Sequence, residues 1–148
     1  MKKMKIYLDN CCYNRPFDDQ TQERIHLESE AILTVLQRGQ SGIYTIVGSD
    51  VLQLEIERMH DVVKKQQVTD LYKVSDTHIL YTKEIKERAK EIRKQSKIKT
   101  FDSLHIASAE MGEVDVMLTT DDKLEKMSGK LDLKIRVMNP LKFAWEVI

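Results

Sequence analysis

The sequence predicts an α/β domain of three layers, with helices on both faces of a central parallel sheet of about five strands. Two observations lead to this fold class. Short apolar runs rich in Ile, Val, Tyr and Thr alternate along the chain with longer segments of helical periodicity. Parallel strands need crossover connections, and helices are the usual crossovers. An alternation of this kind therefore favours a parallel sheet that is covered on both sides.

The boundaries of the elements follow from the apolar pattern. Five runs are expected to be strands: Ile6–Leu8, Ile43–Val47, Thr77–Tyr81, Val116–Thr119 and Ile135–Met138. Six segments are expected to be helices: Gln22–Leu36, a segment from Asp50 to Met59, Thr82–Gln95, Phe101–Met111, Asp121–Met127 and Pro140–Val147. Gly39 and Gly42 are expected to end the first helix, and Asp50 and Gln53 have the spacing of a capping box.

Length and composition limit the class of protein. A chain of 148 residues, 41% hydrophobic and 32% charged, is typical of one globular domain, so residues 1–148 are expected to form a single unit. No apolar run reaches the roughly 20 residues of a membrane-spanning helix, and the N-terminus has no secretory signal pattern. We therefore expect a cytoplasmic protein without a membrane partner. The adjacent Cys11 and Cys12 lack the spacing of a zinc site and are expected to be free thiols.

The charge of the chain is balanced overall but uneven locally. Lys and Arg total 24 and so do Asp and Glu, so the net charge gives no sign of a nucleic-acid partner. Residues 83–99 contain eight Lys or Arg and three Glu. This segment is either the solvated face of a helix or a patch that attracts phosphates. Lys97 and Lys99, together with Arg15, are the candidates for contacts with phosphates.

Four acidic residues are expected to meet at one edge of the sheet. Asp9 and Asp121 directly follow predicted strands, while Glu55 and Asp102 lie near the starts of predicted helices. The carboxyl ends of parallel strands and the N-termini of the returning helices face the same edge. Converging carboxylates repel one another unless a cation neutralises them, and ligation by oxygen alone favours Mg²⁺ or Mn²⁺.

Taken singly, these assignments have alternatives. Asp102 and Asp121 could both cap helices by accepting backbone N–H groups. Glu57 competes with Glu55 on the same predicted helix. His105, one turn beyond Asp102, is either a general base or a histidine held within the helix packing.

Four segments taken together resemble the motifs of the PIN family of nucleases, in the family's order across the whole chain. They are Ile6–Asn10, a strand that ends in an Asp; Ser49–Glu55, a Ser with a Glu six residues on; Phe101–Ala109, an Asp before an alanine-rich helix; and Leu118–Leu124, a Leu- and Thr-rich block with an Asp. The spacing selects Glu55 over Glu57. The segments Asn10–Cys12 and Arg15–Asp19 are not general family features, which leaves the choice of substrate open.

The resemblance implies metal-dependent hydrolysis of phosphodiester bonds, mainly in single-stranded RNA, with the four acids as catalytic and metal-binding residues. Mg²⁺ or Mn²⁺ would lower the pKa of a water and stabilise the oxygens around the reacting phosphorus. Asn10 is expected to orient Asp9 through an amide hydrogen bond, and Thr119 or Thr120 to orient a water or a carboxylate.

The family includes toxins of toxin–antitoxin pairs, so the implied partners are RNA, an antitoxin protein and a second copy of the chain. The main alternative is a catalytically silent PIN-like module that binds RNA or serves as a scaffold. A phosphoacceptor receiver domain is disfavoured, because no Asp closes the third predicted strand near Leu80.

Overall fold

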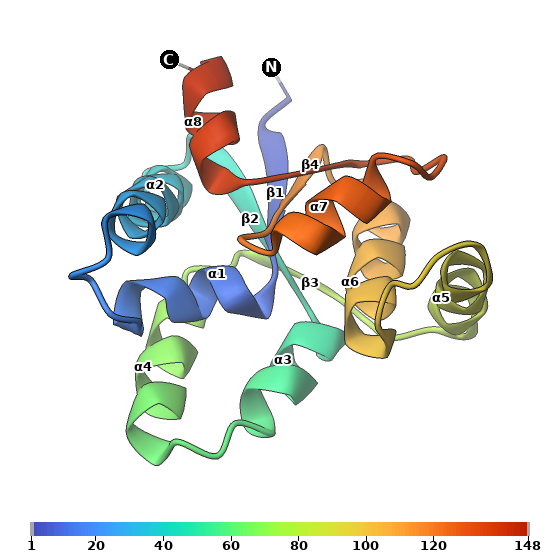
Figure 1. Cartoon of the computed structure of the whole chain (residues 1–148), viewed down its shortest axis with the longest axis horizontal. Coiled ribbons are helices and arrows are strands. Elements are labelled where there is room, and N and C mark those ends of the chain that lie inside the picture. Colours follow the sequence, from blue (N-terminus) through green and yellow to red (C-terminus); the bar gives the residue numbers. More distant parts are fainter. Residues whose placement is uncertain (1, 148) are drawn as a thin grey trace.

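The computed structural model describes residues 2–147 and contains a parallel sheet of five strands in the order β3-β2-β1-β4-β5. The strands are β1 (Met4–Leu8), β2 (Tyr44–Ser49), β3 (Thr77–Ile79), β4 (Val116–Leu118) and β5 (Arg136–Met138). Figure 1 shows α2 (Glu23–Gln40) on one side of the sheet, and α6 (Thr100–Met111) with α5 (Lys83–Gln95) on the other. The predicted three-layer fold with a five-stranded parallel sheet is confirmed.

The remaining helical elements lie between these strands and at the C-terminal end of the described chain. They are α1 (Asn10–Asn14), the 3₁₀ turn η1 (Arg15–Phe17), α3 (Asp50–Glu57), α4 (Val62–Tyr72), α7 (Asp122–Ser128) and α8 (Pro140–Val147). Within residues 2–147, no helix combines the length and the apolar character that crossing a membrane requires.

The centre of the sheet forms the core of the molecule. In β1, Ile6, Tyr7 and Leu8 are fully buried, as are Met117 and Leu118 of the neighbouring β4. A strand with partners on both edges and helices over both faces is buried on every side, which explains why its sequence is continuously apolar. β3 lies at an edge, pairs with β2 over only three residues and is partly exposed, so it is shorter than the predicted Thr77–Tyr81.

The start of α3, the helix after β2, differs from the prediction. Ser49 is its N-cap and accepts a hydrogen bond from the backbone N–H of Leu52 at 3.0 Å. The Asp50 carboxylate instead accepts the backbone N–H of Tyr81 at 2.7 Å and lies 2.6 Å from a ring nitrogen of His78. The predicted capping box at Asp50 is therefore wrong, because its carboxylate is used to fix the chain after β3.

Two helices escaped the sequence prediction. The predicted helix from Asp50 to Met59 ends at Glu57, and a separate helix, α4, follows it. α4 buries only Val68, so its sequence has no clear apolar period. The short helix α1 begins directly after Asp9, whose side chain caps it by accepting the N–H of Cys12. A helix of one turn is too short to produce a periodic signal.

The end of α2 shows two different uses of glycine. The helix continues past the predicted Leu36 to Gln40, and Gly39 lies within it against Ile46 of β2. A Cβ at Gly39 would stand 2.4 Å from Cγ1 of Ile46, so only glycine allows this close approach. Gly42, with φ of 80°, supplies the left-handed turn that leads into β2.

The order of the strands creates a topological switch point beside β1. The chain passes from β1 to β2 and β3 on one side, then returns to place β4 and β5 on the other. Helices that follow neighbouring strands therefore lead away in opposite directions from the carboxyl ends of β1 and β4. In open parallel sheets such a divergence leaves a crevice, and ligands bind there.

Candidate functional site

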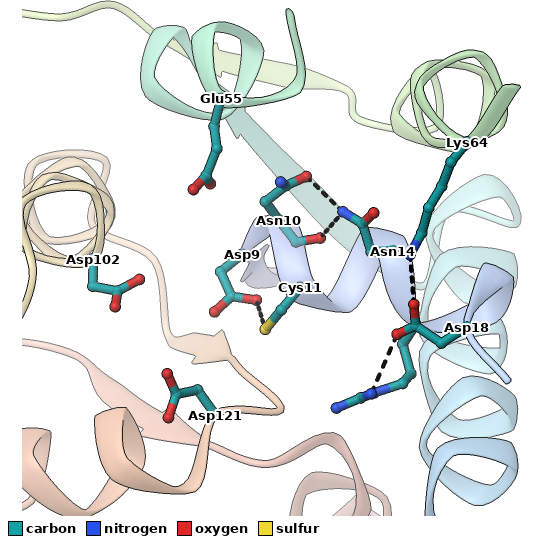
Figure 2. Close-up of a pocket in the computed structure, with 10 residues that line it drawn as sticks. Asp9, Asn10, Cys11, Asn14, Asp18, Glu55, Lys64, Asp102 and Asp121 are labelled. Carbon is teal, nitrogen blue, oxygen red and sulfur yellow. Dashed lines mark hydrogen bonds and ion pairs between the residues drawn. The ribbon is translucent and has the colours of Figure 1, made fainter. Parts of the chain in front are cut away.

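A cavity of about 390 Å³ lies at this edge of the sheet, and all four predicted acids line it. Its lining residues are Asp9, Asn10, Cys11, Asn14, Arg15, Asp18, Glu55, Lys64, Asp102 and Asp121. Figure 2 shows the carboxylates of Asp9, Glu55, Asp102 and Asp121 directed into the same space, with Asp18 and Lys64 farther along the wall. Four different parts of the chain therefore deliver one acid each to a single cavity.

Asp9 is the most enclosed of the four acids. It follows β1, is 4% exposed, and its Oδ1 accepts the backbone N–H of Cys12 at 3.1 Å and the Cys11 thiol at 2.7 Å. Burial raises the pKa of the Asp9 carboxyl well above its usual range, because an ionised group loses hydration in the protein interior. These contacts fix the direction of the carboxylate at the end of the strand.

Asp102 lies in the first turn of α6. The N-cap position of this helix belongs to Lys99, so the capping explanation does not apply to Asp102. The pKa of the Asp102 carboxyl rises to about 6, mainly through burial and then through repulsion from Asp9, with Asp121 and Glu55 adding to it. The four acids thus share one electrostatic environment.

Asp121 combines two positions. It is the N-cap of α7, and its Oδ1 accepts the backbone N–H groups of Lys123 at 3.0 Å and Leu124 at 3.2 Å. The capping explanation is therefore correct for this residue, and it does not remove the carboxylate from the cavity. The cap holds Asp121 in place at the end of β4.

Glu55 is held by a chain of hydrogen bonds that crosses the core. Its Oε1 lies 2.8 Å from Nε2 of His105, while Nδ1 of His105 lies 2.6 Å from the Tyr7 hydroxyl. That hydroxyl lies 2.7 Å from Oγ of Ser49. If Ser49 donates to Tyr7, Tyr7 to Nδ1, and the Nε2–H group to Glu55, every partner is satisfied with a neutral imidazole.

These hydrogen bonds favour the interpretation of His105 as a histidine held within the packing. His105 is 1% exposed and both of its ring nitrogens are engaged, so it supports Glu55 from behind. Glu57, the competing acid, lies beside another surface hollow lined by Gln53 and Thr69. The sequence analysis named Ser49 only as part of the motif that contains Glu55, and it did not identify Tyr7, because a tyrosine in a buried strand carries the same signal as any core residue.

The supporting residues are only partly where they were expected. Oγ1 of Thr119 accepts the backbone N–H of Asp121 at 3.1 Å, and the Thr120 N–H is 3.4 Å from the Cys11 sulfur. Asn10 lines the cavity, but its side-chain oxygen accepts from Asn14 at 3.1 Å. The hydrogen bond described for the Asn10 side chain thus runs along its own helix, and the expected amide contact with Asp9 stays a prediction.

Cys11 is a cavity residue that the sequence analysis missed. Ligand atoms of Asp9, Cys11 and Cys12 all lie within 4.8 Å of one another, and both cysteines are free thiols as predicted. The signal was the position of Cys11, two residues beyond an acid that ends a central strand. Because α1 begins there, the thiol turns back toward Asp9.

The acidic end of the cavity fits a hard divalent cation. It offers carboxylate oxygens from four residues, and two of these, Asp9 and Asp102, have raised pKa values that an added positive charge would lower. Oxygen ligands of this kind suit Mg²⁺ and Mn²⁺.

The predicted phosphate-contacting residues separate into two groups. Arg15 lines the cavity, whereas Lys97 and Lys99 are exposed in the loop that leads into α6. Within the basic segment, Ile85, Ala89 and Ile92 bury the inner face of α5, and Arg93 donates to Oγ of Ser103 on α6 at 2.7 Å. Arg93 thus serves the packing of the two helices.

Comparison with known proteins supports the fold. Two solved structures have similar folds: VapBC2 from Rickettsia felis bound to a DNA fragment from its promoter, and DNA-bound VapBC from Salmonella typhimurium. Each aligns with a TM-score of 0.61 at 14% identity, covering 92% and 93% of this chain and 98% of the other chain in both cases. No curated protein sequence matches. The model of the PIN domain matches residues 8–130, a span that contains all four acids and most of the chain, and the chain therefore belongs to the PIN domain family.

Proposed function

We propose that the chain is a divalent-metal-dependent ribonuclease that hydrolyses phosphodiester bonds, mainly of single-stranded RNA, with residues 1–148 acting as one nuclease domain. The observation that carries this proposal is the convergence of Asp9, Glu55, Asp102 and Asp121 in one cavity at the switch point of the sheet. These four residues would hold Mg²⁺ or Mn²⁺. Such a cation, when bound, activates a water and stabilises the oxygens of the reacting phosphate.

The residues around the acids prepare the site before any substrate binds. Asp9 is fixed by the start of α1, Asp121 by the start of α7, and Glu55 by His105. Each of these three carboxylates is held by a different part of the fold, which opposes their turning out into solvent under mutual repulsion. Ligands held in this way bind a cation with little loss of side-chain freedom.

The substrate would reach the acids across a partly cationic surface. Arg15 lies in the wall of the cavity, and Lys97 and Lys99 lie on the loop just before the helix that presents Asp102. We assign these three residues to contacts with RNA phosphates, because clustered positive charge attracts a polyanion without reading its sequence.

A cleavage assay with the purified protein tests the enzymatic proposal. A labelled single-stranded RNA should be cut in Mg²⁺ or Mn²⁺, remain intact in Ca²⁺, and be protected reversibly by EDTA. Asp9→Asn and Asp102→Asn should each reduce the rate by about a hundredfold or more, since each removes a charged ligand. Cleavage that persists in EDTA would contradict the metal-dependent mechanism. Tight RNA binding without cleavage in any of these ions would favour the silent RNA-binding module.

The biological role we propose is that of the toxin of a toxin–antitoxin pair, acting on RNA in the cytoplasm. The similarity of fold to chains of two VapBC assemblies supports this choice. Induced expression of the unmutated chain should arrest growth of the host, whereas expression of Asp102→Asn should not.

Purification from the native organism tests the partners. It should yield a complex with a small antitoxin protein, and the mass of the isolated chain will show whether it also forms a homodimer. Growth that is unaffected by an active enzyme would contradict the toxin role and leave the nuclease assignment standing.

A further inference from the structure

A carboxylate held between two cations occupies the wall of the cavity beyond the four acids. Oδ1 of Asp18 accepts a hydrogen bond from Nζ of Lys64 at 2.6 Å, and its Oδ2 accepts from a terminal nitrogen of Arg15 at 3.2 Å. Figure 2 shows Lys64 extending from α4 to reach Asp18. Each oxygen of the carboxylate therefore faces one positive charge, and all three residues line the same cavity as Asp9 and Asp102.

Arg15 is fixed from behind by a buried carboxylate. Its Nε lies 3.2 Å from Oε1 of Glu28, an ion-pair contact without hydrogen-bond geometry, and the Glu28 side chain has no exposed surface. The other oxygen of Glu28 accepts from Asn139 at 2.7 Å and from Arg24 at 3.3 Å. Glu28 therefore cannot turn away, and it keeps the free end of the Arg15 guanidinium directed at Asp18. A guanidinium held in this way binds an anion with little further loss of freedom.

The arrangement has the features of a phosphate-binding site with a substitute anion in it. A phosphodiester group has two non-bridging oxygens that share one negative charge, and a carboxylate likewise has two oxygens that share one negative charge. Arg and Lys are the usual ligands of such a group, Arg through its planar fork and Lys as a compact charge. The side chains of Arg15, Asp18 and Lys64 are 20%, 24% and 29% exposed, so solvent and a ligand can reach them from the cavity.

We infer that Arg15 and Lys64 form a subsite for a backbone phosphate of the nucleic acid, next to the phosphate that reacts at the four acids, and that Asp18 occupies this subsite in the free protein. The inference rests on the proposed nuclease function. The described structure gives the Asp18 carboxylate these two cationic partners, and a partly exposed ion pair contributes little stability. The incoming phosphate can therefore displace it.

Asp18 then sets how strongly the subsite binds. In the free protein Asp18 neutralises both cations. A phosphate must displace its carboxylate, so the net binding free energy is the difference between the two interactions. A single phosphate at this site is thus held weakly, whereas a strand that also engages the acids gains from both contacts. The subsite favours a polymer over a free nucleotide.

The first test compares two neighbouring lysines of α4 in the Asp102→Asn background, which prevents turnover during binding. Lys64→Gln removes the charge from the subsite, whereas Lys65→Gln removes the same charge from a residue whose Nζ donates to the Glu57 carbonyl oxygen. Binding of a fluorescein-labelled single-stranded RNA oligonucleotide in Mg²⁺ should weaken about tenfold for Lys64→Gln and change less than about twofold for Lys65→Gln. The slope of log affinity against log salt should fall by about 0.7 for Lys64→Gln alone.

The second test releases the substitute anion. Asp18→Asn keeps the shape of the side chain but removes its charge, so it should tighten RNA binding several-fold and steepen the salt dependence. The gain should disappear in Asp18→Asn combined with Lys64→Gln, because only Arg15 remains. In a set of RNA oligonucleotides, one phosphate at a time is replaced by a neutral methylphosphonate linkage. At one position, this replacement should weaken binding to the Lys65→Gln protein and leave binding to the Lys64→Gln protein unchanged.

The outcomes separate this inference from the function on which it rests. Equal RNA affinities and salt slopes for Lys64→Gln and Lys65→Gln would overturn the subsite. So would an Asp18→Asn variant that binds RNA no better than its parent while retaining its melting temperature. Cleavage of RNA by the unmutated protein, measured separately, decides the nuclease proposal. An active enzyme with identical KM values for both lysine variants would therefore reject the subsite alone.

Discussion

The electrostatic cost of bringing four carboxylates together falls mainly on Asp9 and Asp102. Both have pKa values raised by burial, and in Asp102 the repulsion from the other three acids adds to the effect. The protein compensates locally at three of the four acids: backbone N–H groups donate to Asp9 and Asp121, and a ring nitrogen of His105 faces Glu55. For Asp102 the described residues supply no such hydrogen bond to the carboxylate, and its pKa rises to about 6, within a range that unfolding experiments can cover.

Asp102→Asn should stabilise the metal-free protein. The folded-state pKa of Asp102 is about 6, above the ordinary value of 3.8. Its contribution to stability is thus fully present below pH 3.8 and is lost as the pH rises through about 6. Above that pH the variant should be more stable by on the order of 1 kcal/mol, after allowance for solvent screening of a partly exposed group. Thermal unfolding in EDTA across this pH range measures the difference, and a difference independent of pH would contradict the explanation.

His105→Ala tests whether the histidine positions Glu55 or exchanges protons with substrate. We expect kcat to fall about tenfold, because Glu55 loses its partner and the Tyr7 hydroxyl keeps only its contact with Ser49. The shape of the pH–rate profile should not change. His105→Gln, which can still donate one hydrogen bond, should recover part of the activity. Loss of one limb of the pH profile would instead identify His105 as a general acid or base.

The helices of this fold place their first turns at the site and their buried faces against the sheet. α1, α3, α6 and α7 each begin at the carboxyl edge, and each carries or is capped by a residue of the cavity. Their positions depend on close packing of α2 and of the α5–α6 pair farther away. Substitutions at this scale should change stability or substrate attraction without touching the acids.

Gly39→Ala should destabilise the protein by about 1–3 kcal/mol, because the new methyl group would overlap the Ile46 side chain in the core. Gly129→Ala is the matched control. At that glycine the atoms nearest a new Cβ, carbonyl oxygens, lie at 3.5 and 3.7 Å, and its φ of −65° suits alanine, so its stability should stay equal or rise slightly. Denaturant unfolding compares the two variants. Equal stabilities would mean that α2 can shift on β2 without cost.

Replacing Lys97 and Lys99 by Gln decides between the two interpretations of the basic segment. If the loop attracts RNA, the double variant should bind a single-stranded RNA more weakly and lose about 0.7 of salt slope for each phosphate contact removed. Lys90→Gln with Lys94→Gln, on the exposed face of α5, is the control of equal charge and should have little effect. Equal losses from both pairs would indicate a general electrostatic attraction instead of a defined contact.

The sheet as a whole decides where the acids meet. β1 and β4 are neighbours, so Asp9 and Asp121 flank the switch point, and the helices that carry Glu55 and Asp102 start on either side of it. A cation held there would connect four elements that are distant in sequence. Its binding should therefore be felt by the global unfolding transition.

Mg²⁺ or Mn²⁺ should raise the melting temperature of the unmutated protein in a concentration-dependent manner. A ligand at about a hundred times its dissociation constant adds about 2.7 kcal/mol to the free energy of unfolding. Asp9→Asn should reduce this gain. The comparison is made at equal ionic strength, adjusted with a monovalent salt. Differential scanning calorimetry with a cation series provides the measurement. A shift of equal size in Asp9→Asn would place the stabilising cation elsewhere.

The sequence by itself predicted the fold class, the approximate strands and the four acids of the cavity. Those predictions were accessible because apolar alternation, the position of an acid after a strand or near a helix start, and the spacing of the motif that contains Glu55 are local properties of the chain. The same reasoning failed for α1 and α4, which are too short or too weakly buried to leave a period, and for Asp50, whose partners come from the edge of β3.

Only the tertiary structure decided which distant residues meet. The strand order brings β4 beside β1, His105 reaches Glu55 across 50 positions of sequence, and Lys64 reaches Asp18 across 46. No local pattern encodes such pairs, because they depend on how the helices pack over the two faces of the sheet. The acids could therefore be named from the sequence. The contacts that hold Glu55 in place, and the position of Asp18 between two cations, could be identified only in the folded chain.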